Sequence, residues 1–284
     1  MKFDRRHSAF RLRKRHWFHR MMMVLIFIAV LIAMVPLLSI FGYVLQQGLP
    51  ALNWNFLTQL PAPTGETGGG MGNAILGSLT MILMASLWGV PIGISCGVYL
   101  SEYKIGFVAK VLRQATDLLS TLPSIVVGLF VYVILVVPMK NFSAWAGGLA
   151  LSILMIPMII KTTEEILRLL PQHVREAGLS LGIPRWRVII SIVLKGSAGP
   201  LTTGVLLSIA RISGETAPLL LTAFGNNLWM QSLNQPTPSL PVQIYNYAIS
   251  PYAHWHQQAW AGAFVLVFLV MCLNLVSRLV MKKR

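Results

Sequence analysis

Six long stretches of apolar residues, separated by more polar connections, dominate the pattern of this chain. They lie at 21–45, 74–100, 115–139, 145–160, 200–224 and 259–280. A helix needs about 20 mainly apolar residues to cross the hydrocarbon core of a bilayer, and the fourth stretch reaches this length with its flanking residues 142–144 and 161–163. The pattern therefore predicts an all-α, polytopic membrane protein with six transmembrane helices.

Basic residues divide the connections between these stretches into two classes. The connections 46–73 and 225–258 contain no Lys or Arg, and the connection at 140–144 contains only Lys140. Both ends of the chain and the connections 101–114 and 161–195 are basic. Because cytoplasmic loops carry an excess of Lys and Arg, this alternation predicts that both termini lie in the cytoplasm. Only Lys140 and Arg211 then fall outside the cytoplasmic side.

Composition excludes an ordinary soluble enzyme. The chain is 55% hydrophobic and 11% charged, whereas about a quarter of the residues of a soluble domain are charged. The formal charge of +15 could indicate a nucleic-acid partner or an anionic substrate. Since the basic residues follow the predicted topology, they orient the chain in the membrane, and a nucleic-acid partner is not needed to explain them.

Residues that could support catalysis or metal binding are sparse. The glycine-rich stretch 68–72 lacks the Gly-Lys-Ser/Thr ending of a phosphate-binding loop. Cys96 and Cys272 lie in apolar stretches, without the spacing of metal ligands. His254 and His256 form a pair in an outer loop, which favours solvated histidines over a metal site. We therefore expect no enzyme activity, and no metal or cofactor bound by this chain.

The most informative polar residues lie inside the fifth predicted span. Arg211 and Glu215 are four residues apart, so on a continuous helix they would share one face. One interpretation is an ion pair that fixes packing. The other is an anion path, in which Arg211 donates to an oxyanion, Glu215 orients it or excludes the wrong charge, and Ser213 and Thr216 add neutral donors. Asp117, near the start of the third span, is expected to be a helix-terminal residue.

The cytoplasmic connection 161–195 contains a short predicted helix that is broken at Gly182. Such a helix between two spans could dock into a groove of another protein, with Glu176 as a polar contact and with the small residues Ala177 and Gly178 allowing close approach. The alternative is a solvated amphipathic connector. The pattern by itself favours neither interpretation.

The same segment resembles the EAA motif of ABC-importer permeases, which is Glu-Ala-Ala-x-x-x-Gly followed after nine residues by Ile-x-Leu-Pro. Here residues 176–182 read EAGLSLG and residues 192–195 read IVLK. Gly178 therefore replaces the second alanine, and Lys195 replaces the proline. The resemblance implies that Glu176, Ala177, Gly178 and Gly182 belong to a coupling helix that fits a cleft of a cytoplasmic ATPase, and that ATP and Mg are bound by that separate subunit.

Within this superfamily, the chain is similar to the PstA-type permeases of bacterial phosphate importers. Five segments carry the resemblance: 69–79 (GGMGNAILGSL), 99–103 (YLSEY), 122–128 (LPSIVVG), 161–165 (KTTEE) and 211–220 (RISGETAPLL). The resemblance implies the architecture of a type I ABC-importer permease. It also implies a substrate pathway that includes Lys161 and Glu164 together with Arg211 and Glu215.

The resemblance further implies a domain organisation and a set of partners. Residues 1–20 would form a basic cytoplasmic N-terminus, 21–45 the first transmembrane helix, and 73–280 a permease core of five transmembrane helices with the coupling segment at 161–195. The expected partners are a cytoplasmic ATPase dimer, a second permease of the PstC type, a periplasmic phosphate-binding protein and the lipid bilayer of the bacterial inner membrane.

The function that follows from the resemblance is ATP-driven import of inorganic phosphate across the inner membrane. Two alternatives are open. A permease for another oxyanion, such as sulfate, molybdate or phosphonate, would carry the same EAA segment. An ion-coupled secondary transporter or a channel would use Arg211 and Glu215 as a gate and would work without an ATPase.

Overall fold

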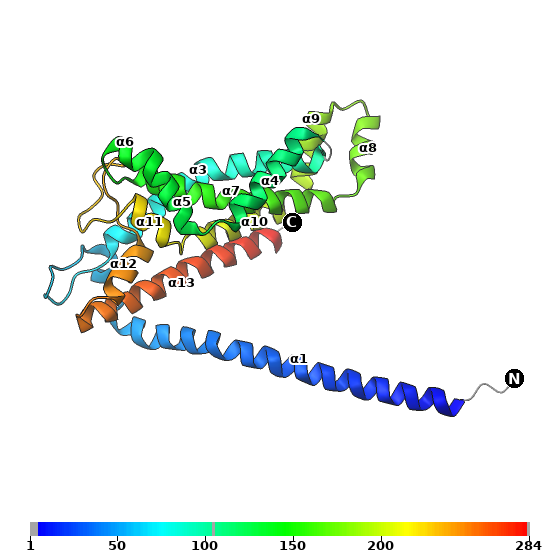
Figure 1. Cartoon of the computed structure of the whole chain (residues 1–284), viewed down its shortest axis with the longest axis horizontal. Coiled ribbons are helices and arrows are strands. Elements are labelled where there is room, and N and C mark those ends of the chain that lie inside the picture. The colour runs from blue at the N-terminus through cyan, green and yellow to red at the C-terminus, as the bar shows by residue number, and fades with distance from the viewer. Residues whose placement is uncertain (1–4, 104–105, 283–284) are drawn as a thin grey trace.

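The computed structural model describes residues 5–103 and 106–282, and over these residues the chain is helical, with a single isolated β-bridge between Pro61 and Gly69 (Figure 1). The all-α prediction is confirmed. The elements are α1 (Arg5–Gly48), η1 (Leu49–Ala51), α2 (Trp54–Thr58), α3 (Gly72–Glu102), α4 (Phe107–Thr121), α5 (Ser124–Val131), η2 (Tyr132–Val136), α6 (Val137–Met139), α7 (Ala144–Leu169), α8 (Gln172–Ser180), α9 (Arg185–Val188), η3 (Ile189–Leu194), α10 (Ala198–Ile212), α11 (Ala217–Thr222), α12 (Leu240–Ala248) and α13 (Ala253–Lys282).

Four of the predicted spans are continuous helices. The first, second, fourth and sixth apolar stretches lie within α1, α3, α7 and α13, each of which is long and apolar enough to cross a membrane. α7 is longer than the stretch 145–160 because Ser143 caps its N-terminus, accepting from the backbone N–H of Ala146 at 3.1 Å, and because the helix continues to Leu169.

The third apolar stretch, 115–139, is a bent pair of helices and not one continuous helix. α4 ends at Thr121, and the helix that starts at Ser124 runs at 106° to it. Pro123 lies at the bend, and a proline has no N–H for the helical ladder and disfavours helical geometry in the residue before it. The stretch therefore divides at Pro123 into α4 and a second helical part that runs from Ser124 to Met139.

The fifth apolar stretch, 200–224, is also interrupted. α10 ends at Ile212, and α11 starts at Ala217 with Pro218 in its first turn. Gly214 lies in the break, where its low helix propensity favours a turn. Before α10, the helical segment Arg185–Leu194 meets it at an angle of 74°. With each bent pair counted as one span, the described chain has up to six candidate spans, which agrees with the predicted number.

The centre of the bundle is the contact between α3 and α7. α3 presents glycines at four-residue spacing, Gly89, Gly93 and Gly97, so they lie on one face of the helix. A Cβ at Gly93 would lie 2.7 Å from Cβ of Ile159, and a Cβ at Gly97 would lie 2.5 Å from Cβ of Thr163. Small residues at such spacing let membrane helices approach closely, so α3 and α7 pack as one unit.

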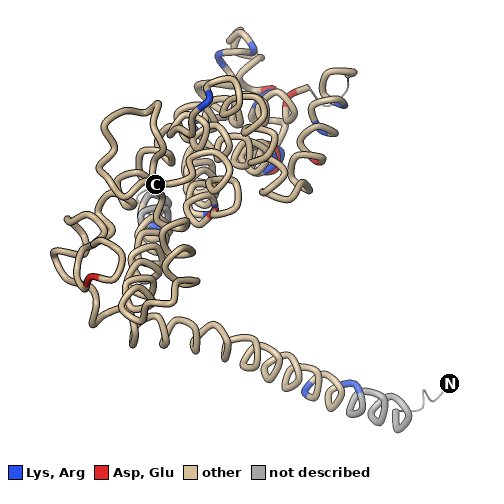
Figure 2. Tube along the Cα trace, turned by 60° about the vertical axis from the view of Figure 1, so that its left-hand side comes forward, with Lys and Arg blue, Asp and Glu red and all other residues tan. Residues whose placement is uncertain are grey.

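α1 differs from the other long helices because it leaves the bundle. It contacts α13 near its C-terminal end, where a Cβ at Gly48 would lie 2.7 Å from the carbonyl oxygen of Trp260, and then extends away from the other helices (Figure 1). Figure 2 shows that the coloured, charged residues of α1 lie near its N-terminal end. The start of α1 lies far from the rest of the bundle, whereas α13 runs back along α10 (Figure 1).

Candidate functional site

Arg211 and Glu215 line one pocket of about 240 Å³. The rest of its wall comes from α4, from the bend at Pro123, and from the part of α7 around Pro157 and Met158. The side chain of Arg211 is exposed, and its Nη1 lies 3.4 Å from Sδ of Met158. Because a thioether sulfur is a weak acceptor, the guanidinium keeps strong donors that could bind an oxyanion.

The structure corrects the predicted relation between Arg211 and Glu215. α10 ends one residue after Arg211, so the two side chains do not share the face of one continuous helix. The ion pairs found in the described part of the chain do not include one between them. Glu215 lies in the turn before α11, and a Cβ at Gly128 of α5 would lie 2.6 Å from Cα of Pro218. This close packing of α11 on α5 fixes the turn that carries Glu215.

Ser213 and Thr216 do not belong to the pocket wall. Ser213 is buried, and its Oγ donates to the backbone carbonyl of Ile209 at 2.7 Å. Thr216 is half-buried and precedes α11, where its carbonyl accepts from the N–H of Leu220 at 3.1 Å. In this conformation the pocket therefore contains Arg211 without the two predicted hydroxyl donors.

Lys161 lies on α7 and joins it to α4. Its Nζ is 2.8 Å from Oδ1 of Asp117 and donates to Oγ of Ser120 at 2.9 Å. Asp117 lies four residues before the end of α4, so the prediction that it is helix-terminal is wrong. Ser120 also lines the pocket of Arg211, and it therefore connects the two groups of predicted pathway residues.

Glu164 is the buried centre of a second ion-pair group between the same helices. Its Oε1 accepts from Nη2 of Arg113 on α4 at 2.8 Å and also from Nη2 of Arg168, one turn further along α7. Glu164 is 8% exposed, and a buried polar group is costly unless it is hydrogen-bonded, as it is here. The geometry makes Glu164 a link between α4 and α7.

The residues of α4 in these groups were not predicted as pathway residues. The sequence did contain a signal, because Arg113, Asp117 and Ser120 are spaced at i, i+4 and i+7 and lie on one face of a helix. That signal is lost when residues 115–139 are treated as one span. The bend at Pro123 lets α4 turn this polar face toward α7.

The cytoplasmic connection predicted at 161–195 has the expected break at Gly182. α8 ends at Ser180, and Gly182 has φ +75°, a left-handed conformation that glycine adopts without strain. Gly178 is buried, and a Cβ there would lie 3.0 Å from Cδ1 of Ile192 and from Cγ2 of Val188. The close approach predicted for Gly178 is therefore made by its own chain, whereas Ala177 is exposed.

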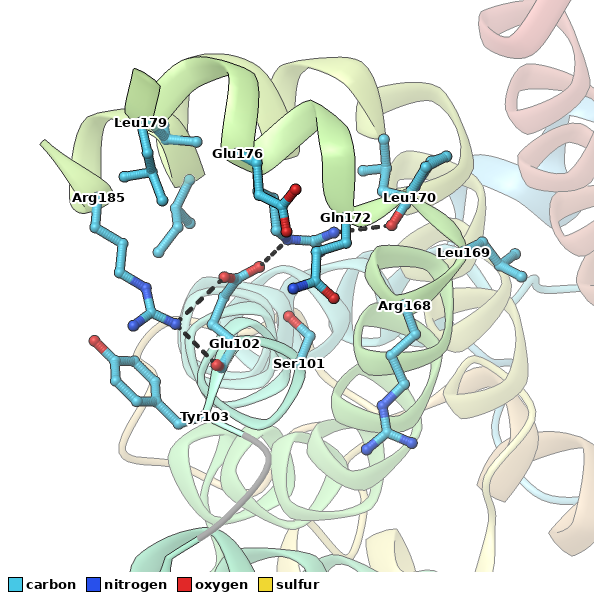
Figure 3. Close-up of a pocket in the computed structure, with 14 residues that line it drawn as sticks. Ser101, Glu102, Tyr103, Arg168, Leu169, Leu170, Gln172, Glu176, Leu179 and Arg185 are labelled. Atoms are coloured by element: carbon cyan, nitrogen blue, oxygen red, sulfur yellow. Dashed lines mark hydrogen bonds and ion pairs between the residues drawn. The ribbon is translucent and has the colours of Figure 1, made fainter. Parts of the chain in front are cut away.

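Figure 3 shows the pocket between α8 and the ends of α3 and α7, which has a volume of about 720 Å³. Glu176 and Gln172 point from α8 into this pocket, and Leu179 also lines it. Glu176 is exposed, but its side chain faces its own bundle. A contact of Glu176 with another protein would therefore need that protein to reach the pocket.

A cluster of charges that the sequence reading missed lies at the end of α3. Glu102 accepts at Oε1 from Nε of Arg175 at 2.8 Å, and its backbone carbonyl accepts from Nη2 of Arg185 at 3.0 Å. Arg175 also donates to the carbonyl oxygens of Leu170 and Leu167, both at 2.8 Å. The signal was present, since Glu102 is one of only eight acidic residues and lies in the YLSEY segment.

His254 and His256 lie in the first turn of α13, two residues apart and so on different faces of the helix. Nε2 of His256 lies 2.7 Å from the carbonyl oxygen of Ser250. Within the described residues, no group of three or more His, Cys, Asp and Glu could hold a metal ion. The geometry therefore does not support a metal site at this pair.

Comparisons with known proteins agree with the helical architecture. The sequence profile of the binding-protein-dependent transport system inner membrane component family matches residues 89–283. The phosphate transport system permease protein PstA of Yersinia pestis is 42% identical over 100% of this chain and 95% of its own length. PstA of Pasteurella multocida is 45% identical over 92% of this chain and 93% of its own length.

Solved structures show the same fold at low identity. A chain of a bacterial alginate ABC transporter, crystallised with an alginate-bound periplasmic protein, is 14% identical, with a TM-score of 0.66 over 95% of this chain and 96% of that chain. A chain of the MetNI methionine ABC transporter in an inward-facing conformation is 15% identical, with a TM-score of 0.63 over 75% of this chain and 95% of that chain. The chain therefore belongs to the family of binding-protein-dependent transport system inner membrane components, and it is a multi-pass membrane protein of the ABC-importer permease fold.

Proposed function

We propose that this chain is the membrane-spanning subunit of an ATP-driven importer that moves inorganic phosphate across the inner membrane. The similarity to PstA permeases over nearly the whole chain carries the proposal. The exposed guanidinium of Arg211 in a pocket adjoining α4 and α7 gives it a chemical basis. An arginine offers several N–H donors in a planar fork, which matches the oxygens of a phosphate.

In this mechanism, Arg211 binds phosphate as the permease changes between outward-open and inward-open states. Glu215 lines the same pocket and repels anions that approach without the correct geometry. With both termini in the cytoplasm, as we propose, Lys161, whose ammonium is held by Asp117 and Ser120, would receive phosphate after Arg211. Ser213 and Thr216 would contribute only if the turn after α10 rearranges during transport.

The importer also needs subunits that this chain does not supply. We propose a second permease of the PstC type, a dimer of cytoplasmic ATPases that bind ATP and Mg, and a periplasmic phosphate-binding protein. Residues 161–195 would carry the contact with the ATPase, with both termini in the cytoplasm. Residues 73–280 would form the permease core, while residues 1–20 and 21–45 would form the basic N-terminus and the first span.

The test is transport by the reconstituted complex in vesicles that contain ATP. We expect uptake of labelled phosphate that requires ATP hydrolysis and the phosphate-loaded binding protein, and that excess sulfate, molybdate or phosphonate does not inhibit. Inhibition of uptake by one of these anions at a similar concentration would favour a permease for that oxyanion. Uptake that follows an ion gradient without ATP would favour a secondary transporter or channel and would contradict the proposal.

A further inference from the structure

The end of α3 carries a carboxylate that is almost completely removed from solvent. The side chain of Glu102 is 5% exposed, and its Oε1 lies 2.8 Å from Nε of Arg175. Arg185 approaches the other oxygen, with Nη2 at 3.9 Å from Oε2, and stacks over the ring of Tyr103 at 4.8 Å. Because a buried carboxylate without partners is strongly unfavourable, this arrangement fixes the position of both arginines relative to α3.

Arg175 uses its remaining donors on a third helix. Nη1 donates to the carbonyl oxygen of Leu170 and Nη2 to that of Leu167, both at 2.8 Å. These carbonyls belong to the C-terminal end of α7, where backbone acceptors have no partner within the helix. A single planar guanidinium therefore joins α8, which carries Arg175, to the ends of α3 and α7.

The apolar packing of α8 is not against α3 or α7 but against the segment that follows it in the chain. Gly178 brings α8 against Val188 and Ile192, which lie in the segment that leads into α10. Between α8 and the ends of α3 and α7 lies the pocket of about 720 Å³ instead of close apolar packing, and the dashed lines to Glu102 and Leu170 cross this region (Figure 3). The contacts of Arg175 therefore connect α8 to the end of α3, and they reinforce the short covalent connection from α7 to α8 through Leu170 and Pro171.

We propose that Glu102 and Arg175 are positioning residues that make α8, α3 and α7 move as one body, so that displacement of α8 by the ATPase reaches the substrate pathway. The link ends on the two helices that pack through Gly93 and Gly97, and α7 carries Lys161 and the wall of the Arg211 pocket. This inference rests on the proposed importer function, because it requires an ATPase that acts on α8.

The first experiment measures coupling in the reconstituted complex with Arg175→Gln, Arg175→Lys and Glu102→Gln. We expect phosphate transported per ATP hydrolysed to fall about tenfold with Arg175→Gln, since charge-assisted hydrogen bonds are lost. With Arg175→Lys this ratio should fall nearly as far, because a lysine keeps the charge but lacks the planar fork of donors. The ATPase subunits should still co-purify with each variant. Unchanged coupling would overturn the proposal, and so would loss of ATPase binding, which would make these residues part of the docking surface.

Arg187→Gln provides the matched control. Arg187 is an exposed arginine of α9 whose guanidinium lies over the ring of Trp186 at 5.8 Å, so its substitution removes a charge from the same segment without touching the link. Coupling in Arg187→Gln should stay within about twofold of the wild type. An equal loss of coupling in Arg187→Gln and Arg175→Gln would show that coupling depends on the net charge of the segment and not on the contacts of Arg175 with Glu102 and α7.

A second experiment restores the link covalently. The double variant Glu102→Cys and Arg175→Cys is made in a background with Cys96→Ala and Cys272→Ala. It should transport less phosphate per ATP hydrolysed, and a short bifunctional reagent that joins the two thiols should restore most of this ratio. A merely structural role would not predict this rescue. If the crosslink instead abolishes the remaining transport of the double variant, α8 must move relative to α3, and the proposal is wrong.

A distance measurement separates this inference from the choice of substrate. Spin labels at Leu87→Cys on α3 and Leu181→Cys after α8, two exposed positions, report whether these elements move together. We expect the same distance distribution with and without ATP in the wild type, and an ATP-dependent shift in Arg175→Gln. A shift in the wild type would overturn the link. This result does not depend on the anion, so failure of phosphate uptake would contradict the proposed function alone.

Discussion

Two arginines, Arg175 and Arg211, lie in opposite environments within one bundle. Arg175 is 18% exposed, pairs with the buried Glu102, and donates to two backbone carbonyls at the end of α7. Arg211 is exposed and lines a pocket, where its Nη1 lies 3.4 Å from the weakly accepting sulfur of Met158. The first guanidinium has its donors used by the fold, whereas the second has donors available for a ligand. This difference is the basis for the two roles proposed above, in which Arg175 transmits motion and Arg211 binds the anion.

The largest effect should come from Arg211→Gln. We expect uptake to fall about a hundredfold or more, because a charge-assisted pair of hydrogen bonds to the anion is lost. The ATPase subunits should still co-purify, since α8 is untouched. The measurement is initial uptake of labelled phosphate in vesicles. Normal uptake by this variant would remove Arg211 from the pathway and end the contrast with Arg175.

Arg211→Lys sharpens the same comparison. A lysine keeps the positive charge but loses the planar fork, so we expect uptake to fall about tenfold, with a weaker apparent affinity at saturating ATP. Concentration-dependent uptake separates affinity from maximal rate. Equal loss in Arg211→Lys and Arg211→Gln would mean that the fork is essential, whereas full activity of the lysine variant would mean that charge alone is sufficient.

The two small residues of α8, Ala177 and Gly178, should respond differently to enlargement. Gly178→Leu places a side chain against Val188 and Ile192, and such overpacking should destabilise the isolated permease by about 1–3 kcal/mol. Ala177→Leu adds an exposed side chain, so the thermal stability of the permease should not change while binding of the ATPase weakens. Thermal unfolding and ATPase co-purification distinguish the two. Equal destabilisation by both would contradict the inward placement of Gly178.

The smallest effect is expected from Asp117→Asn. The side chains of Asp117 and Lys161 are 61% and 41% exposed, respectively, and exposed ion pairs contribute about 0–1 kcal/mol. Uptake should therefore change by less than about fivefold, and it should rise if Asp117 competes with phosphate for Lys161. A loss as large as that of Arg211→Gln would show that the α4–α7 ion pair is as important as the pocket arginine.

Much of the fold and part of the site could be predicted from the sequence. Long apolar stretches predicted α1, α3, α7 and α13, because the length of hydrocarbon to be crossed fixes the length of the helix. The segment that contains Gly182 was predicted as a broken helix because glycine and proline act locally. Arg211 was identified because a charge inside an apolar stretch is costly and needs a reason.

The missed features depend on contacts between distant segments. The pair of Glu102 and Arg175 spans 73 residues of sequence, and neither residue type indicates its partner. The four-residue spacing of Arg211 and Glu215 suggested one helical face, but the break around Gly214 and the packing of Pro218 on Gly128 place them on separate elements. The low helix propensity of Gly214 agrees with the break between α10 and α11, but a prediction based on one continuous span does not include this break.

The sequence by itself therefore determined the class of protein, the six long apolar stretches, the family and the presence of Arg211 near the middle of one of those stretches, since hydrophobic length, charge and motif are properties of the chain. Tertiary structure decided which arginine is held and which is available. That distinction depends on burial and on the acceptors within reach of each guanidinium, and the acceptors of Arg175 come from α3 and α7. Only the packing of these helices brings the acceptors to one place.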